Sequence, residues 1–136
     1  MDPVSTVMSR RVVAILSECD LTVAVDTFLS SGVRHLVVVD PDRTVVGLLS
    51  VDQVLAALGQ PAWPGRVGDL VRAEPARVHP DDDLPRAAEV MLDALVDAIL
   101  AADETGRVVG IVTWTDLVAH VAGRHLGDGG RQPARP

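Results

Sequence analysis

Two pairs of polar residues lie where they could contact a ligand. Thr113 and Asp116 are three residues apart at the expected start of a helix, and Arg34 and His35 come directly before an expected strand. Thr-x-x-Asp is close to a capping box, in which the hydroxyl and the acid satisfy backbone N–H groups at a helix start. An ionised carboxylate is also a strong acceptor for ligand hydroxyl groups, and Arg is suited to small anions. The residue types therefore allow both a structural and a ligand-binding interpretation.

Other clusters of reactive side chains do not assemble into a convincing centre. The segment His79-Pro-Asp-Asp-Asp83 contains oxygen ligands but no glycine turn or distal acid at loop spacing, so a polar turn capping the following helix is favoured over a metal site. His120 and His125 are not spaced for one helical face. Cys19 has no basic neighbour in sequence. We therefore expect no catalytic residue and no metal site, and the chain is not predicted to be an enzyme.

Composition and charge restrict the class of protein. Apolar residues make up 48% of the 136 residues but aromatic residues only 2%, so small aliphatic side chains must fill the core. The net charge of −7, with no basic stripe, argues against nucleic acid as a partner. No apolar run is long enough to span a bilayer, and the N-terminus lacks the regions of a signal peptide. These features predict a cytoplasmic protein with no membrane contact.

The chain repeats itself at an offset of 63 positions. The offset holds without a gap from Val4/Val67 to Ala56/Ala119, and both copies contain a Val-Val-Gly sequence, at 45–47 and 108–110. An internal repeat determines architecture before any single motif is considered. A unit of about 55 residues has a marginal core of its own, so the two copies are expected to form one assembly.

Each copy has the pattern strand, helix, hairpin, helix. In the first copy, apolar residues at helical spacing follow Asp20, a suitable N-cap, and end at Gly32, a suitable C-cap. Two apolar runs then surround a Pro/Asp turn, which predicts a hairpin buried on both faces. A second helix is expected to start at Ser50, and at Thr113 in the second copy. Short strands are expected upstream, at 12–16 and 77–78.

These segments resemble a tandem pair of CBS domains, known as a Bateman module. The resemblance is carried by Gly32-Val-Arg-His-Leu-Val-Val-Val-Asp40 in the first copy and by Gly106-Arg-Val-Val-Gly-Ile-Val-Thr-Trp-Thr-Asp116-Leu-Val in the second. It covers roughly residues 1–122. The expected division is repeat 1 at 1–60, a linker at 61–66, repeat 2 at 67–123 and a disordered tail at 124–136.

The resemblance implies an α+β fold of two β-α-β-β-α repeats that pair through their sheets with pseudo-twofold symmetry. It also implies two clefts between the repeats, which in many members bind adenine nucleotides. In that pattern the Thr/Ser-x-x-Asp carboxylate accepts hydrogen bonds from the ribose hydroxyls, and basic residues before the strand meet a phosphate. Each cleft takes its first-strand and pre-strand residues from one copy and its Thr/Ser-x-x-Asp from the other.

By that rule the two clefts are unequal. One combines the ligand-binding candidates of the chain, which are Val12, Val13, Val33, Arg34, His35, Thr113 and Asp116. The other combines Asp97 and Ala98 with Ser50 and Gln53, where an acid would repel a phosphate and a neutral amide is a poorer acceptor for a diol. Simple core packing remains an equal alternative for each valine, and helix capping remains an alternative for Thr113 and Asp116. Pairing with a surface acid remains an alternative for Arg34, and a structural role remains one for His35. We expect one competent site per chain.

The resemblance therefore implies a stand-alone regulatory module without a tightly bound cofactor. It would bind an adenine nucleotide such as AMP, ADP or ATP in one inter-repeat cleft and modulate an effector protein that the sequence does not identify. A homodimer formed through the helices is expected, with Trp114 either at the dimer contact or packed on its own module. The alternative is a CBS-type dimerisation or interaction module whose clefts hold no nucleotide.

Overall fold

The computed structural model describes residues 2–60, 65–71 and 73–123, which divide into two compact units. The N-half unit is Val13–Pro75, and the C-half unit combines the residues up to Val12 with those from Ala76 onwards. The predicted tail at 124–136, and residues 61–64 of the predicted linker, lie outside the described residues. No helix in the described part of the chain is long and apolar enough to cross a membrane.

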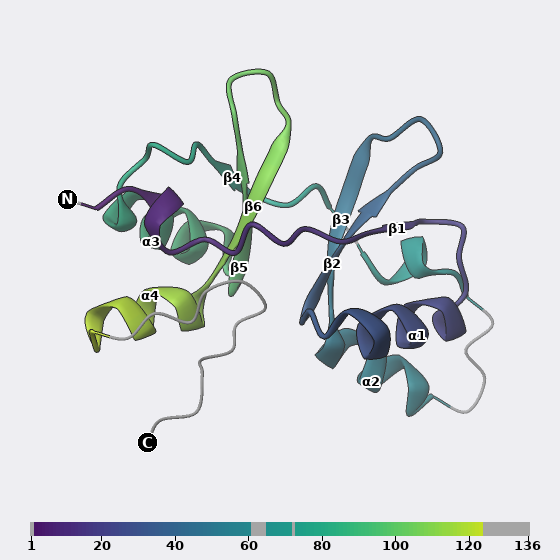
Figure 1. Cartoon of the computed structure of the whole chain (residues 1–136). Coiled ribbons are helices and arrows are strands. Elements are labelled where there is room, and N and C mark those ends of the chain that lie inside the picture. The colour runs from purple at the N-terminus through teal and green to yellow at the C-terminus, as the bar shows by residue number, and fades with distance from the viewer. Residues whose placement is uncertain (1, 61–64, 72, 124–136) are drawn as a thin grey trace. The chain divides into compact units, whose positions relative to one another are not determined.

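Both units contain the elements predicted from the repeat (Figure 1). The N-half unit consists of β1 (Ala14–Leu16), α1 (Leu21–Ser31), β2 (His35–Val39), β3 (Val45–Ser50), α2 (Val51–Leu58) and the 3₁₀ helix η2 (Val67–Leu70). The C-half unit consists of η1 (Val4–Thr6), β4 (Arg77–Val78), α3 (Leu84–Ala94), β5 (Ala98–Ala102), β6 (Val108–Thr113) and α4 (Trp114–Val121). The predicted α+β class is confirmed.

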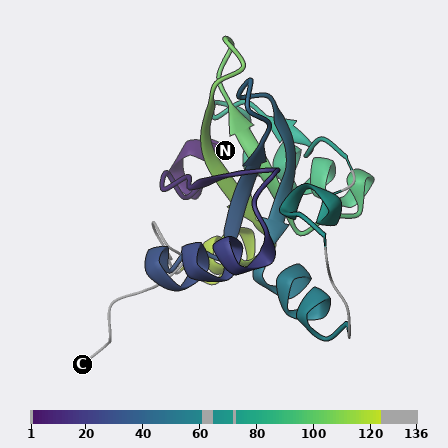
Figure 2. The same cartoon turned by 90° about the vertical axis from the view of Figure 1, so that its right-hand side faces the viewer.

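Each unit is built on a three-stranded sheet with the same pairing. β1 runs parallel to β2, which pairs antiparallel with β3, and β4, β5 and β6 repeat this order. The pairs His35↔Ser50 and Ala98↔Thr113 begin the two hairpins, and both hairpins have an irregularity one residue before the central strand ends. In both views the β5–β6 turn lies at the end of its sheet away from α4 (Figures 1 and 2). All five residues of β5 are buried, so both faces of this strand are covered, as predicted.

The first helix of each unit starts at the predicted aspartate. The Asp20 Oδ1 accepts from Val23 N at 3.2 Å, and the Asp83 Oδ1 accepts from Arg86 N at 3.0 Å. These bonds satisfy N–H groups that have no partner within the helix. At the other end of α1, Gly32 has φ 73°, a left-handed conformation that glycine adopts without a steric penalty.

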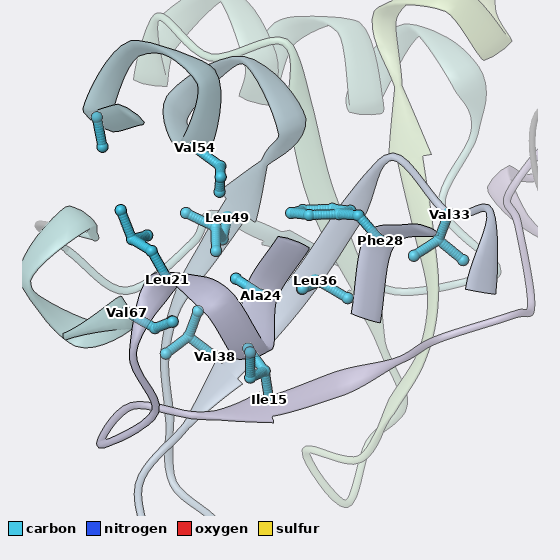
Figure 3. Packing of buried hydrophobic residues seen from close by; sticks show 11 residues of the cluster. Ile15, Leu21, Ala24, Phe28, Val33, Leu36, Val38, Leu49, Val54 and Val67 are labelled. Atoms are coloured by element: carbon cyan, nitrogen blue, oxygen red, sulfur yellow. The ribbon is translucent and has the colours of Figure 1, made fainter. Parts of the chain in front are cut away.

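Apolar side chains of helices and sheet form the core of the N-half unit (Figure 3). Leu21, Ala24 and Phe28 come from one face of α1 and meet Leu36 and Leu49 of the sheet. Val54 of α2 joins the same cluster. Leu36 and Leu49 are fully buried, and burial of one such side chain contributes about 1.5–3 kcal/mol. This packing holds the ends of β2 and β3, where the candidate polar residues lie.

Each unit is completed by a segment that precedes the other unit's helices in the chain. We call residues 2–9 the N-terminal arm and residues 66–71 the linker arm. The N-terminal arm lies in the C-half unit, where Val4 N donates to the Asp82 carbonyl at 2.7 Å and Val4 is fully buried. The linker arm lies in the N-half unit, where Val67 N donates to the Cys19 carbonyl at 2.7 Å and Val67 is fully buried. The compact units therefore differ from the sequence repeats in which arm they contain.

The packing of the two arms explains why the Val-Val-Gly sequence occurs in both units. A Cβ atom on Gly47 would overlap the Cβ and methyl groups of Val71 in the linker arm. A Cβ atom on Gly110 would lie 2.6 Å from the Sδ of Met8 and 3.0 Å from the Ser9 carbonyl oxygen in the N-terminal arm. Glycine is required at both strand positions because each arm passes directly over the strand.

Candidate functional site

The second helix of each unit begins with a capping box. In the C-half unit Asp116 N donates to Thr113 Oγ1 at 3.1 Å, and Thr113 N donates to Asp116 Oδ2 at 2.8 Å. Thr113 ends β6 and Asp116 lies in the first turn of α4, so the strand-to-helix transition positions both side chains. The capping interpretation is thus confirmed. A carboxylate has about four lone-pair sites, so a capping role does not by itself exclude a ligand-binding role.

Burial distinguishes Asp116 from the other acids. It is the one charged residue in the described part of the chain that is classed as buried, with 7% of its surface exposed. A buried carboxylate is stable only where hydrogen bonds replace its lost water, and the cap supplies such bonds. The same capping carboxylate can present an acceptor to a hydroxylated ligand.

The corresponding residues of the N-half unit are fixed differently. Gln53 N donates to Ser50 Oγ at 3.1 Å, and Ser50 N donates to Gln53 Oε1 at 2.8 Å, which completes the second capping box. The amide nitrogen of Gln53 also donates to the Leu70 carbonyl in the linker arm, at 3.3 Å. Both ends of the Gln53 amide are therefore used within the unit. Asp52, one position earlier, is exposed.

The basic candidates lie in the N-half unit. Arg34 is exposed, and its carbonyl accepts from Val51 N at 3.2 Å, which holds the start of β2 against the start of α2. His35 is the half-buried first residue of β2 and is paired in register with Ser50. In the C-half unit Asp97 and Ala98 occupy these places, and the Asp97 carbonyl accepts from Trp114 N at 2.7 Å.

The three candidate valines differ in their surroundings. Val33 is buried in the core cluster of the N-half unit, and Val13 is partly buried against that cluster. Val12, half-buried, is the last residue of the N-terminal segment that belongs to the C-half unit. The structure thus brings Val13, Val33, Arg34 and His35 together in one unit, and Val12, Thr113 and Asp116 in the other. Their joint action on one ligand stays a prediction.

The segment between β4 and α3 is the polar turn that the sequence predicts. His79 N donates to Asp82 Oδ2 at 2.9 Å, and Asp83 caps α3. A hydrogen bond between His79 Nε2 and Glu104 Oε2, 2.8 Å long, raises the pKa of His79 and lowers the pKa of Glu104. Coulombic attraction by Asp81 adds to the rise for His79. Asp82 and Asp83 therefore accept hydrogen bonds that form the turn and cap α3, and Glu104 forms the ion pair with His79.

The sequence patterns did not predict the conformation at the end of α3. Leu95 ends α3 with φ 56°, at the position where the first copy has Gly32, and its side chain is 90% exposed. The signal was present in the sequence, because the repeat offset aligns a leucine with a C-cap glycine.

The chain matches known proteins along nearly its whole described length. The family model of the CBS domain matches twice, at residues 4–60 and 67–123. The CBS domain-containing protein DDB_G0289609 of Dictyostelium discoideum is 24% identical in an alignment that covers 85% of this chain and 88% of that protein. The uncharacterized protein MJ1225 of Methanocaldococcus jannaschii is 25% identical over 86% of this chain. The chain spans only 42% of MJ1225 and 38% of the related protein MJ1232 of the same organism.

Solved structures share the fold. The CBS domain pair of protein MJ0100, in complex with 5′-methylthioadenosine and S-adenosyl-L-methionine, matches with a TM-score of 0.79 and 22% identity, over 90% of this chain and 98% of that one. CBSX2 in complex with AMP matches with a TM-score of 0.72 and 24% identity, over the same shares. The two family matches, each covering one sequence repeat, show that this chain belongs to the CBS domain family and carries two CBS domains in tandem.

Proposed function

We propose that the chain is a regulatory module that binds one adenine nucleotide and passes its occupancy to a partner protein. Asp116 is the acceptor for the ribose hydroxyls, Thr113 supports it, and Arg34 with His35 contacts the phosphate. Val12, Val13 and Val33 form an apolar slot for the base, since small β-branched side chains are stiff. The adenosine-containing ligands named for the MJ0100 and CBSX2 structures support this ligand class.

The observation that carries the proposal is the contrast between Asp116 and Gln53. Asp116 places a buried carboxyl group at a helix start, whereas the neutral Gln53 is hydrogen-bonded at both ends of its amide. A vicinal diol donates two hydrogen bonds, which an ionised carboxylate accepts better than an amide does. One ligand per chain is therefore proposed.

Isothermal titration with AMP, ADP, ATP and S-adenosylmethionine tests the proposal. We expect one site per chain and a loss of at least about tenfold in affinity for Asp116→Asn, which keeps a capping oxygen but removes the charge. Gln53→Ala and Asp52→Asn are matched controls on α2 and should leave affinity unchanged. Two equivalent sites, or an unchanged Asp116→Asn, would contradict the proposal. Thermal denaturation gives a parallel measure, because a hundredfold excess of ligand over Kd stabilises by about 2.7 kcal/mol.

A second function, assembly through the helices, is supported by exposed apolar residues at matching repeat positions. Leu55 and Leu58 of α2 correspond to Val118 and Val121 of α4, and all four are at least half exposed. Apolar patches of this kind are typical of interaction sites. We propose that they form a homodimer contact. Sedimentation equilibrium of Leu55→Ser/Val118→Ser should show monomers where the unaltered chain shows dimers. No thermal shift across the nucleotide panel, together with this dissociation, would favour assembly as the whole function.

A further inference from the structure

Several residues at the end of α3 are unfavourable for the stability of the fold. Leu95 adopts a left-handed conformation that costs a residue with a Cβ atom more than it costs glycine, and its side chain is 90% exposed. At the equivalent position of α1 the chain has Gly32, so the fold itself accepts glycine there. Strained, non-glycine positions of this kind are often retained for function.

Two carboxylates at the same helix end are also unfavourable locally. Asp93 lies in the last turn of α3 and Asp97 just beyond it, and both are exposed. Neither forms an ion pair with any residue that the structure describes. The C-terminus of a helix carries partial negative charge, which repels acids. The first copy has Ser30 and Arg34 at these positions, so the acids are specific to the C-half unit.

Exposed apolar residues lie next to these acids in the sequence. Leu92 is 63% exposed and Val96 44% exposed. Trp114 is half exposed, and its backbone N–H donates to the Asp97 carbonyl, which places it at the same edge of the unit. We name these residues the α3-end patch: Leu92, Asp93, Leu95, Val96, Asp97 and Trp114. Aromatic residues such as tryptophan are enriched in interface hot spots, and polar groups form the rim of an interface.

We propose that the α3-end patch is the docking surface for a protein segment that presents apolar side chains beside lysine or arginine, such as a basic amphipathic helix. The apolar side chains would cover Leu92, Leu95 and Val96, and the basic groups would neutralise Asp93 and Asp97. Nucleic acid and anionic lipid carry the wrong charge for these acids. A second copy is also a poor match, because the chain has net charge −7 and patch against patch would bring acids together. The inference gives a contact surface to the partner of the proposed regulatory module, but it does not depend on nucleotide binding.

Trp114 fluorescence provides the test. A Trp63→Phe background leaves Trp114 as the single reporter, since the chain has two tryptophans. The probes are a synthetic amphipathic helix of leucine and lysine, and the same pattern with glutamate in place of lysine. We expect saturable binding of the lysine peptide with a change in Trp114 emission, and none for the glutamate peptide. Leu95→Gly, which restores the residue of the first copy, and Asp93→Asn/Asp97→Asn should each weaken binding about tenfold.

Matched variants on α1 separate docking from general charge attraction. Leu29→Ala and Asp26→Asn remove an exposed leucine and an exposed acid from the other unit and should leave peptide affinity unchanged. Equal binding of both peptides, or equal losses from α1 and α3 variants, would overturn the proposal. So would a change from dimer to monomer in sedimentation of Leu95→Gly, which would assign the patch to a second copy, or binding to vesicles of anionic lipid. Peptide affinity retained in Asp116→Asn would show that docking stands even where nucleotide binding fails.

Discussion

The N-half and C-half units share a backbone but differ at its edges. Hydrogen bonds recur at the repeat offset: Val4 N to the Asp82 carbonyl matches Val67 N to the Cys19 carbonyl, and Ser5 N to the Pro80 carbonyl matches Gly68 N to the Ser17 carbonyl. Fully buried valines at 4 and 67 fill the same place in the two cores. The shared features are those on which burial and backbone hydrogen bonding depend, and they tolerate little change.

The differences gather at the ends of helices and strands. Asp116 replaces Gln53, Asp97 replaces Arg34, and Leu95 replaces Gly32 when the C-half unit is compared with the N-half unit. Two ion pairs of histidines with acids, His79 with Glu104 and His120 with Asp2, lie in the C-half unit. The two units therefore share one scaffold, while their polar and exposed positions carry different residues.

The largest effect should come from charging a buried arm residue. Val4→Asp and Val67→Asp each place a carboxylate in a fully buried position, which should cost more than about 4 kcal/mol of unfolding free energy. The N-terminal arm packs in the C-half unit and the linker arm in the N-half unit. Val4→Asp should therefore increase amide hydrogen exchange first in residues 76–123, and Val67→Asp first in residues 13–60. Val23→Asp, on an exposed position of α1, is the control. If amide hydrogen exchange increased only in the sequence repeat that contains the mutation, the packing of each arm in the other unit would be contradicted.

The two strand glycines should differ in how much they tolerate alanine. Both Gly47→Ala and Gly110→Ala overpack an arm contact, at a cost of about 1–3 kcal/mol. Gly47→Ala should cost more, because the Val71 side chain is branched at Cβ, whereas the Met8 side chain can move. Urea denaturation measures the difference. Gly59→Ala, where a Cβ atom would have only ordinary contacts, should change stability little, and equal values for all three variants would exclude the close approach.

Swapping the residues at the ends of α1 and α3, Gly32 and Leu95, should change stability in opposite directions. Leu95→Gly relieves a left-handed non-glycine residue and should stabilise the chain by up to about 1 kcal/mol, while Gly32→Leu should destabilise it by about as much. Apart from its chain neighbours, no described residue comes within 4 Å of the place that a Cβ atom on Gly32 would take, so the cost there is conformational and not a clash. Thermal and urea unfolding measure both. A destabilised Leu95→Gly would mean that the leucine side chain contributes to the fold.

The smallest effect concerns pH. The hydrogen bond to Glu104 raises the pKa of His79, so this contact stabilises the folded C-half unit below the unfolded pKa and is lost as pH rises through the raised, folded pKa. The pKa of Glu104 is lowered, so its contribution is lost as pH falls through that lowered value. Asp81 N donates to His79 Nδ1 at 3.0 Å, a bond that the protonated ring loses, and this limits the effect.

Replacing His79 or Glu104 measures how much their contact contributes to the pH dependence of stability. His79→Gln should flatten the decrease in stability between slightly acidic and slightly alkaline pH that the unaltered chain shows. Urea unfolding across that range is the measurement, and Glu104→Gln should have a similar effect because the hydrogen bond dominates the shift. An unchanged pH profile in His79→Gln would show that the contact contributes nothing in solution.

Much of the fold could be predicted from the repeat. Helix starts at Asp20 and Asp83, capping at Ser50 and Thr113, and the hairpins follow from local patterns that act over a few residues. The glycines at 47 and 110 could be recognised as recurring, but their reason could not be predicted. It depends on Val71 and Met8, which are distant in sequence and meet the strands only after folding.

The candidate site was predicted in part. The amino-acid sequence by itself determined which residue types were available, and it placed the neutral Gln53 where the other copy has Asp116. Tertiary structure decided that Asp116 is buried and that the Gln53 amide donates to the Leu70 carbonyl. Sequence patterns determine helices and strands because capping and periodicity act over a few residues. Burial, and the packing of each arm in the other unit, depend on which surfaces exclude water once distant segments pack together.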